Sequence, residues 1–365
     1  MTEPGLVAVL PLRRALERAA EWDALHAATG ASPFMSAAWH AGWVGSGEAG
    51  DAFVIVQRNA GGTVEAIFPF SIRRLPYRRV PFRTLTWAVS DTAAPDHLDL
   101  LAAPTADLAP LARQVLSLPW TVLHLGALAE SAPGARRLAA ELVTMGCHVD
   151  FHTYNRCPFI DLPATWEGLL HEMSSSRREN VRRKERALFR RYHVEVEQVP
   201  PDRFEEGWNT LVSLHEKRWD QGVLGGAGRL AQHRAMVADG GAAWETWLSI
   251  LRADGRPVAA WYGFAANGTV SYYQGGRDPA YGRDSVGQVL MGIMIRRAIE
   301  RGFRRFDFMR GEEPYKFTWT DTVADTHALA VVRPGLTRVV RQTLDLLAAL
   351  RTTWRSDGAV SGETS

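Results

Sequence analysis

The chain has little cysteine and no long apolar stretch. Of its 365 residues only Cys147 and Cys157 are cysteines, too few for the disulfide framework that holds small secreted domains together. No apolar run approaches the roughly 20 residues that a membrane-spanning helix needs. Pro4, Pro11 and several charges interrupt the N-terminus before a secretory core could form. We therefore expect a cytoplasmic protein that does not enter a membrane.

A large excess of one charge is also absent. The 42 lysines and arginines nearly balance 40 aspartates and glutamates, which leaves a net charge of +2. No overall field therefore draws the protein toward DNA or a membrane surface, and neither is expected as a partner. A polyanion such as tRNA would have to bind a local basic patch. The composition, 46% hydrophobic and 22% charged, is that of an ordinary globular protein.

The length and the pattern of the chain predict two domains. In the first half, strands are predicted at residues 53–57, 64–70, 84–89, 97–101 and 122–125, and a helix at residues 134–145. Pro158 and Pro163 indicate a boundary near residue 155. The expected units are an N-terminal domain at residues 1–155, with residues 331–354 returning to complete it, a C-terminal domain at residues 156–330, and a disordered tail at residues 355–365.

The second half predicts a meander followed by a crossover. Strands at residues 247–251, 258–264 and 269–275 are separated by Asp254-Gly255 and Asn267-Gly268, which are typical hairpin turns. A helix at residues 286–301 and a strand at residues 304–309 follow. Strand, helix and strand in this order predict a parallel pair joined by a right-handed crossover.

Two parallel strands joined in this way can diverge and leave backbone amides and carbonyls for an extended, amide-containing ligand. We expect that wedge between residues 272–274 and residues 306–308. The helix after it would begin at its mouth, with Asp284 or Ser285 as N-cap and Gly287 allowing close approach, so that free N–H groups face an anion. The alternative is a capped helix with a purely structural role.

Five segments together resemble a known family. They are SSSRRENVRRKERAL (174–188), LHEKRW (214–219), DGRPVAAWYGF (254–264), YYQGGRDPAY (272–281) and FDFMRGEEPYKFTW (306–319). In order and spacing they resemble the GNAT-type N-acyltransferases of the bacterial cellulose biosynthesis CelD-like group, which is similar to the Fem peptidyltransferases. The resemblance spans most of residues 30–330. It implies an α/β fold with two tandem GNAT-like domains, each a mixed sheet flanked by helices.

The resemblance implies acyl-CoA as the co-substrate. The residues expected to bind it are Tyr273, Gln274, Arg283, Ser285, Gly287 and Gln288. One departure weakens this assignment, because many GNAT enzymes have Gln/Arg-x-x-Gly-x-Gly/Ala, whereas this chain has Arg283-Asp-Ser-Val-Gly-Gln-Val with one glycine out of register. Fem-like relatives use aminoacyl-tRNA instead, and the basic run at residues 177–191 is the candidate for contact with tRNA phosphates, unless it is simply a solvated helix face.

Acyl transfer to an amine needs a proton acceptor, stabilisation of an oxyanion and a proton for the leaving group. Asp307 and Glu312 are the candidate bases, although Asp307 could instead pair with Arg304 or Arg283, and Glu312 could cap a turn. Lys316, next to Tyr315, resembles the aromatic-lysine element of Fem-type active sites and would neutralise a donor phosphate or the oxyanion. Its structural alternative is a surface cation lying over aromatic rings.

The residues expected to bind substrate are Arg218, Trp219, Arg182 and Arg183. Cys147, His148, His152 and Cys157 match no standard zinc spacing, so no metal is expected. The sequence thus predicts an N-acyltransferase that moves an acyl group from acyl-CoA to an amine by direct attack. The alternatives are Fem-like aminoacyl transfer from charged tRNA and a non-catalytic binding module on the same fold. The acceptor, a small-molecule or peptide amine, stays open.

Overall fold

The computed structural model describes residues 6–77, 80–89, 91–217, 224, 227–239 and 244–334. Arg218, Trp219, the expected tail and nearly all of residues 331–354 lie outside the described residues. The chain forms two compact units. Unit 1 comprises the residues up to Ala31, Ala49–Asn155 and those from Asp325 on, and unit 2 comprises Ser32–Glu48 and Arg156–Ala324. The grouping thus places Ser32–Glu48 with the second unit, whereas the sequence suggested the first.

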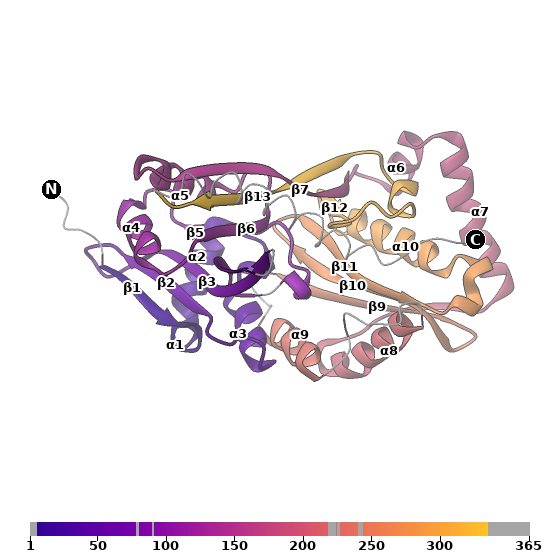
Figure 1. Cartoon of the computed structure of the whole chain (residues 1–365). Helices are drawn as coiled ribbons and strands as arrows, with labels where there is room; N and C mark the ends of the chain where they lie inside the picture. Colours follow the sequence, from indigo (N-terminus) through magenta and orange to yellow (C-terminus); the bar gives the residue numbers. More distant parts are fainter. Residues whose placement is uncertain are drawn as a thin grey trace. The chain divides into compact units, whose positions relative to one another are not determined.

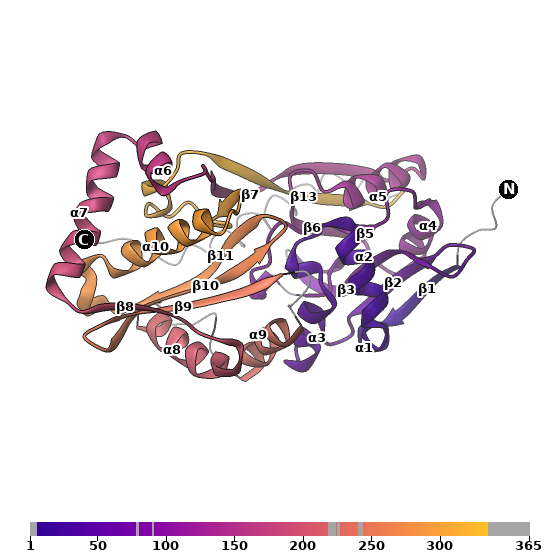
Figure 2. The same ribbon diagram turned by 180° about the vertical axis from the view of Figure 1, so that it is seen from behind.

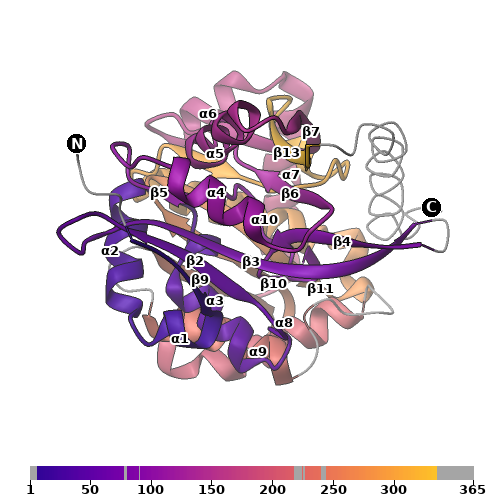
Figure 3. The ribbon, with the colours of Figure 1, turned by 60° about the vertical axis from the view of Figure 1, so that its left-hand side comes forward.

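Unit 1 contains a mixed sheet with helices on both faces (Figure 3). Its strand order is β1-β2-β3-β4-β6-β13, in which β4 and β6 are parallel, whereas the pairs β1–β2, β2–β3, β3–β4 and β6–β13 are antiparallel. The strands are β1 (Leu6–Pro11), β2 (Phe53–Arg58), β3 (Val64–Tyr77), β4 (Val80–Trp87), β5 (Leu101–Ala102), β6 (Val122–Leu128) and β13 (Val323–Val332), and the first part of β7 (His148–Asp161) also belongs here. The helices are α1 (Leu12–Leu16), α2 (Ala19–Thr29), α4 (Ala109–Ser117) and α5 (Pro133–Thr144).

The predicted first hairpin is confirmed, since β2 and β3 pair antiparallel with Phe53 opposite Phe70. The predicted strand at residues 97–101 is wrong. His97 has a φ of 53°, in the left-handed region that a strand cannot use. Only a single bridge from Leu98 to Leu128 and the two-residue β5 remain of it.

Unit 2 contains the second mixed sheet, in the order β7-β12-β11-β10-β9-β8. Its further strands are β8 (Val194–Gln198), β9 (Glu245–Ala253), β10 (Arg256–Ala266), β11 (Thr269–Arg277) and β12 (Arg305–Asp307). Its helices are α3 (Ala37–Gly45), α6 (Trp166–Glu172), α7 (Ser175–Arg191), α8 (Phe204–Glu216), α9 (Ala227–Asp239) and α10 (Val286–Glu300). Figure 1 and Figure 2 show α8 and α9 on one face of this sheet and α10 on the other.

The turns of the meander are as predicted. Asp254, Gly255, Asn267 and Gly268 all have positive φ, as a two-residue hairpin loop of type I′ requires. α10 packs its apolar residues on the sheet because they recur at helical spacing, and Val289, Leu290 and Phe306 are buried in one core cluster. None of the helices in the described parts of the chain is long and apolar enough to cross a membrane.

Candidate active site

β11 and β12 pair over only three positions. Thr269, Val270 and Ser271 lie opposite Arg305, Phe306 and Asp307 in parallel register. Beyond this point β11 continues to Arg277 along β10, whereas the backbone N–H of Phe308 donates to Pro158 on the other side, at 2.9 Å. The predicted parallel pair is therefore present, and its two strands separate after Ser271 and Asp307.

A β-bulge lies in β11 at the point of separation. In the pairing with β10, Tyr262 faces Gln274 and Gly263 faces Tyr272, so Tyr273 is the extra residue. Gly263 is required here, because a Cβ on it would lie 2.0 Å from the carbonyl oxygen of Ser271. Bulges are frequent next to active sites, since they take backbone groups out of the ladder and redirect side chains.

The two tyrosines at the bulge point to opposite faces of the sheet. Tyr272 stacks on Trp261, with ring centroids 5.5 Å apart, on the face that α10 covers. Tyr273 is buried on the other face, with His233 of α9 at 5.3 Å and Tyr262 at 5.9 Å. The predicted coenzyme contacts Tyr273 and Gln274 are thus adjacent in the bulge, but the ring of Tyr273 is directed into a packed aromatic cluster.

His233 is fully buried in this cluster. Its Nδ1 is 3.0 Å from the hydroxyl of Tyr262, and its Nε2 has no hydrogen-bond partner among the described residues. Burial lowers the pKa of His233 to about 3 and raises that of Tyr262 well above 10. Both groups are therefore neutral at physiological pH, and this face of β11 is closed and uncharged.

The end of α8 is joined to the end of β11. The ring of His215 is buried, and its Nδ1 lies 3.0 Å from the carbonyl oxygen of Gly275. Lys217 donates to Asp278 at 2.5 Å, and this hydrogen bond, helped by the one from the N–H of Ala280, lowers the pKa of Asp278. None of these side chains was predicted as a site residue, although three polar residues in a row after an apolar helix, residues 215–217, could have suggested them.

Asp307 ends β12 and is buried, with 3% of its surface exposed. Its Oδ1 accepts the backbone N–H of Met309 at 2.6 Å, and Met309 has a φ of 57°. This carboxylate therefore supports the sharp turn that leads out of the strand. The turn brings the chain toward the other residues that the sequence singled out.

Lys316 is buried to the same extent, with 3% exposed. Its ammonium group donates to the carbonyl oxygens of Met309 at 3.3 Å, Arg310 at 2.6 Å and Gly311 at 3.3 Å, and its Nζ lies 2.9 Å from the carboxylate of Glu313. A buried ammonium needs such partners, because leaving it uncompensated would be costly. The turn after Asp307 is thus built around the Lys316 charge, and the surface alternative for this residue is excluded.

The two remaining candidates of this segment lie nearer the surface. Glu312 forms an ion pair with Arg156 at 2.5 Å, and both side chains are about half exposed, at 50% and 52%. Tyr315 is partly buried against the core of unit 2. Asp307 and Lys316 thus both contact the backbone of Met309 in the turn after β12, whereas Glu312 is half exposed.

The N-terminus of α10 carries the predicted anion-binding residues. Ser285 is the N-cap and has a φ of 54°, but its side chain makes no capping hydrogen bond. The Ser285 hydroxyl therefore does not accept from a backbone N–H of the first turn. The carboxylate of Asp284 accepts from Arg191 at 2.9 Å and from the hydroxyl of Tyr192 at 3.2 Å. Gly287 lies beside Arg277, although a Cβ on it would meet only ordinary contact at 3.4 Å.

Helix α7 runs along α10 and supplies the local cations. Lys184 donates to the side-chain oxygen of Gln288, and burial lowers the pKa of this lysine. Arg182 pairs with Glu167 at 2.6 Å, and Arg183 donates to Asn180 at 2.7 Å. Further members of the run are also paired, Arg177 with Asp321 and Arg186 with Glu179, both on the surface.

Arg283 and Arg190 are exposed. Neither side chain makes a hydrogen bond or an ion pair within the described part of the chain. These two cations, next to the N-terminus of α10 in sequence and at the end of α7, are the most available for a phosphate.

The crevice between α7 and α10 is narrow. Its lining includes Trp166, Lys184, Gln288, Gly292 and Trp319, and its internal volume is about 10 Å³, close to what a single water molecule needs. A ligand would therefore have to lie along its rim or widen it.

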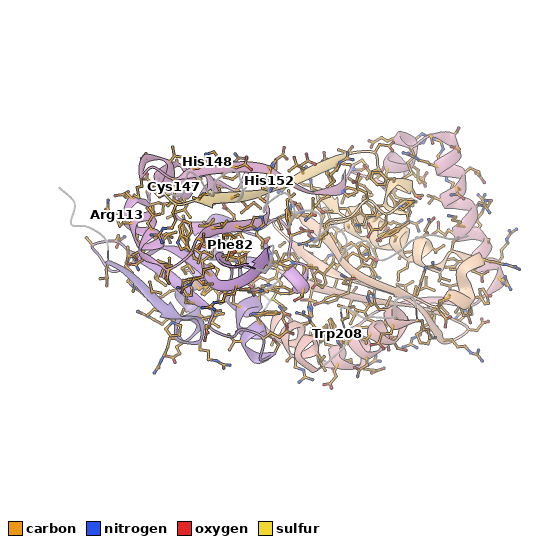
Figure 4. The ribbon with its side chains drawn as sticks, viewed as in Figure 1. Phe82, Arg113, Cys147, His148, His152 and Trp208 are labelled. Atoms are coloured by element: carbon orange, nitrogen blue, oxygen red, sulfur yellow. The ribbon has the colours of Figure 1, made fainter. Side chains whose placement is uncertain are left out.

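Cys147, His148, His152 and Cys157 lie in β7 or directly before it. Cys147 precedes the strand, and His148 and His152 follow along it (Figure 4). His152 contacts Asp150 through Nδ1 at 2.8 Å. Among the described residues no group of three or more histidine, cysteine, aspartate or glutamate side chains could hold a metal ion.

Residues 175–317 match the family model described as "Acetyltransferase (GNAT) domain". These residues form a GNAT domain. The match begins at α7 and ends at Phe317, so it contains α10, the bulge of β11, the turn after Asp307 and Lys316. The predicted resemblance to GNAT proteins is confirmed for this domain, and the finer placement in the CelD-like group stays a prediction.

Solved structures share the fold over both units. The C-terminal domain of a putative lysylphosphatidylglycerol synthetase from Agrobacterium fabrum is 10% identical, with a TM-score of 0.56, and the alignment covers 91% of this chain and 95% of that one. L-PGS from Bacillus licheniformis is 13% identical, with a TM-score of 0.51 and coverage of 92% and 96%. FemX, at 11% identity, has a TM-score of 0.49 and coverage of 76% and 87%. No curated protein matches the chain.

At these identities the likeness concerns the fold alone. Together with the two mixed sheets and the GNAT domain, it confirms the predicted α/β fold of two tandem GNAT-like domains.

Proposed function

We propose that this chain is an N-acyltransferase that moves an acyl group, acetyl or similar, from acyl-CoA to an amine by direct attack. The observation that carries the proposal is the three-position pairing of β11 with β12, next to the bulge at Tyr273 and within the GNAT domain. An extended thioester can there replace the missing strand-to-strand hydrogen bonds with its own amides. The phosphates of the coenzyme would then reach the N-terminus of α10.

In this proposal the amine nitrogen attacks the thioester carbon, the C–S bond breaks and the thiolate leaves. Asp307, or Glu312 through water, takes the proton that the amine loses, and Tyr315 supplies the proton that the thiolate gains. The bulge N–H groups and the nearby Lys316 charge stabilise the oxyanion. Lys316 also holds the turn that ends β12 in shape, since its ammonium contacts three carbonyl oxygens there.

The coenzyme contacts proposed are Gln274, the backbone of Tyr273, Arg283, and the first turn of α10 with Ser285, Gly287 and Gln288. Because Asp284 already pairs with Arg191, part of the local positive charge is used within the protein. The exposed Arg283 then becomes the main side-chain contact for the pyrophosphate.

Aminoacyl transfer from tRNA is the second candidate. The observation that favours it is the basic helix α7, which lies against α10 and ends in the exposed Arg190 and Arg191. Arg182 and Arg183 would also contact tRNA phosphates, after giving up their present partners Glu167 and Asn180. In this reading Lys316 and Asp307 act on an ester in place of a thioester.

Binding measurements separate these readings. Acetyl-CoA that binds only the folded state must raise the melting temperature, and mass detection of an acylated product from a pool of amines would identify the reaction. No shift at saturating acetyl-CoA, combined with binding of charged tRNA that falls steeply with salt, would instead select the tRNA donor. If neither donor binds, the chain is a binding module on a GNAT fold.

A further inference from the structure

A groove lies on one face of the sheet in unit 1. It is lined by Asp51, Phe53, Ile72, Arg74 and Arg83, and its volume is about 320 Å³, at the lower end of the range of small-molecule sites. Phe53 begins β2, Ile72 and Arg74 lie on β3, Arg83 lies on β4, and Asp51 lies in the turn just before β2. Strand alternation places the four strand residues on the same face, because Phe53 faces Phe70, two and four positions before Ile72 and Arg74, and Arg74 faces Arg83.

The two arginines face each other directly across the antiparallel pair. Side chains at such positions have Cβ atoms about 5 Å apart, and like charges placed there destabilise a sheet. Both arginines are exposed, and neither side chain makes a hydrogen bond or an ion pair within the described part of the chain. Their neighbour Arg73, on the opposite face, donates instead to Ser71 at 3.1 Å.

We propose that this groove binds a phosphate group carried on an apolar body. Two guanidinium groups can each offer a planar pair of N–H donors to phosphate oxygens, and the anion removes the repulsion between them. Phe53 and Ile72 are partly buried and supply the apolar contact for the rest of the ligand. The site is separate from the residues proposed for acyl transfer and does not depend on that function.

Asp51 lies in the same lining and opposes part of the positive charge. It makes no ion pair with either arginine in the described residues. Its carboxylate should therefore weaken binding of a bare phosphate ester, and Asp51→Asn should tighten it several-fold.

The test uses phenyl phosphate as the probe, with titration calorimetry on the full chain. Arg74→Gln and Arg83→Gln should each weaken binding about ten-fold or more, as loss of a charge-assisted hydrogen bond implies. The matched control is Arg113→Gln, which removes the same charge from an exposed position of unit 1 on α4 (Figure 4) and should change binding less than about two-fold. Equal affinity in all variants, or no binding of the probe to the unaltered chain at millimolar concentration, would overturn the proposal.

Two further arms identify the source of the phosphate. Inorganic phosphate should bind more weakly than phenyl phosphate, because it leaves Phe53 and Ile72 without a partner. Vesicles of phosphatidylcholine with phosphatidic acid are compared with vesicles of phosphatidylcholine alone. Retention that depends on phosphatidic acid and is lost in Arg74→Gln indicates a lipid headgroup, whereas binding of phenyl phosphate without it indicates a soluble ligand.

A separate readout checks that the variants fold. Without ligand, removing one of two facing cations should leave the unfolding midpoint unchanged or raise it. If a Gln variant has a lower unfolding midpoint and also fails to bind, the variants Arg74→Lys and Arg83→Lys are measured in its place. Lysine keeps the positive charge but lacks the planar pair of N–H donors of a guanidinium group. Weaker binding by a folded Lys variant therefore supports the proposal, and full affinity contradicts bidentate recognition.

Discussion

The two sheets contain two very different neighbouring pairs of strands. In unit 1, β3 and β4 are joined over eight successive residue pairs, from Phe70 opposite Trp87 to Tyr77 opposite Val80. In unit 2, β11 and β12 are joined over three. Where two strands are paired along their length, as β3 and β4 are, their facing backbone groups bond to each other. Such a pair can bind a ligand only with side chains, here Arg74 and Arg83. An open pair leaves backbone groups for a ligand, and Asp307 and Lys316 lie where the strands separate.

The largest expected effect concerns the site where β11 and β12 separate. Asp307→Asn should reduce turnover about 10²- to 10⁴-fold, because it removes the proposed base while its side-chain oxygen can still accept from Met309. Steady-state kinetics and thermal melting on the same samples check this. The control is Asp161→Asn, an exposed carboxylate on β7, which should keep full activity. An Asp307→Asn enzyme with normal kcat would remove this residue from the chemistry.

Lys316→Met should lower the free energy of unfolding by about 3 kcal/mol. It leaves the buried carbonyl oxygen of Met309, the partly buried ones of Arg310 and Gly311, and Glu313 without their donor. Urea unfolding measures the change. The same substitution at Lys217, which is half exposed and pairs with Asp278 alone, should cost less than about 1 kcal/mol. Equal losses in the two variants would mean that the turn after β12 does not depend on a buried charge.

The closed face of β11 predicts a dependence on pH. The folded-state pKa of His233, about 3, lies below the ordinary value of 6.5, so between these values the unfolded chain binds a proton that the folded chain does not. The free energy of unfolding therefore contains the full contribution of neutral, buried His233 above pH 6.5. Below that pH it falls by up to about 1.4 kcal/mol per pH unit.

Unfolding free energies of the unaltered chain and of His233→Gln, taken from pH 7 to pH 4.5, check this prediction. The variant should lose less stability over that range, whereas His193→Gln, at an exposed position, should follow the unaltered chain. Parallel pH curves for the unaltered chain and His233→Gln would show that this face is open to water.

The smallest effect concerns the N-terminus of α10. Asp284→Asn removes a negative charge from that end of the helix and releases Arg191. If the coenzyme phosphates bind there, the Kd for acetyl-CoA should fall about two- to five-fold. Glu300→Gln, at the other end of the same helix, should leave it unchanged. A higher Kd for acetyl-CoA in Asp284→Asn would mean that the phosphates bind elsewhere.

Much of unit 2 could be predicted from local signals. Alternation of apolar residues and the two Asx-Gly turns predicted the meander, because these turns need positive φ that few other residues accept. A strand, an apolar-faced helix and a strand predicted the parallel pair. The predicted strand at residues 304–309 placed Asp307 inside it, whereas β12 ends at Asp307.

The details of the site depended on contacts distant in sequence. The bulge at Tyr273 arises from the close approach of Gly263 to Ser271, which alternation does not indicate. Lys316 is buried because three carbonyl groups of the preceding turn converge on it, whereas lysine is usually exposed. Ser285 has the residue type of an N-cap, yet its left-handed backbone turns the hydroxyl away from that role. The facing of Arg74 and Arg83 required the register of β3 with β4.

The most direct test of the central claim is a crystal structure of the chain with acetyl-CoA. The open pair predicts that the pantetheine amides hydrogen-bond to the backbone of residues 272–275, with the thioester near Asp307 and the phosphates at the N-terminus of α10. Coenzyme bound at another place, with residues 272–275 uncontacted, would contradict the account.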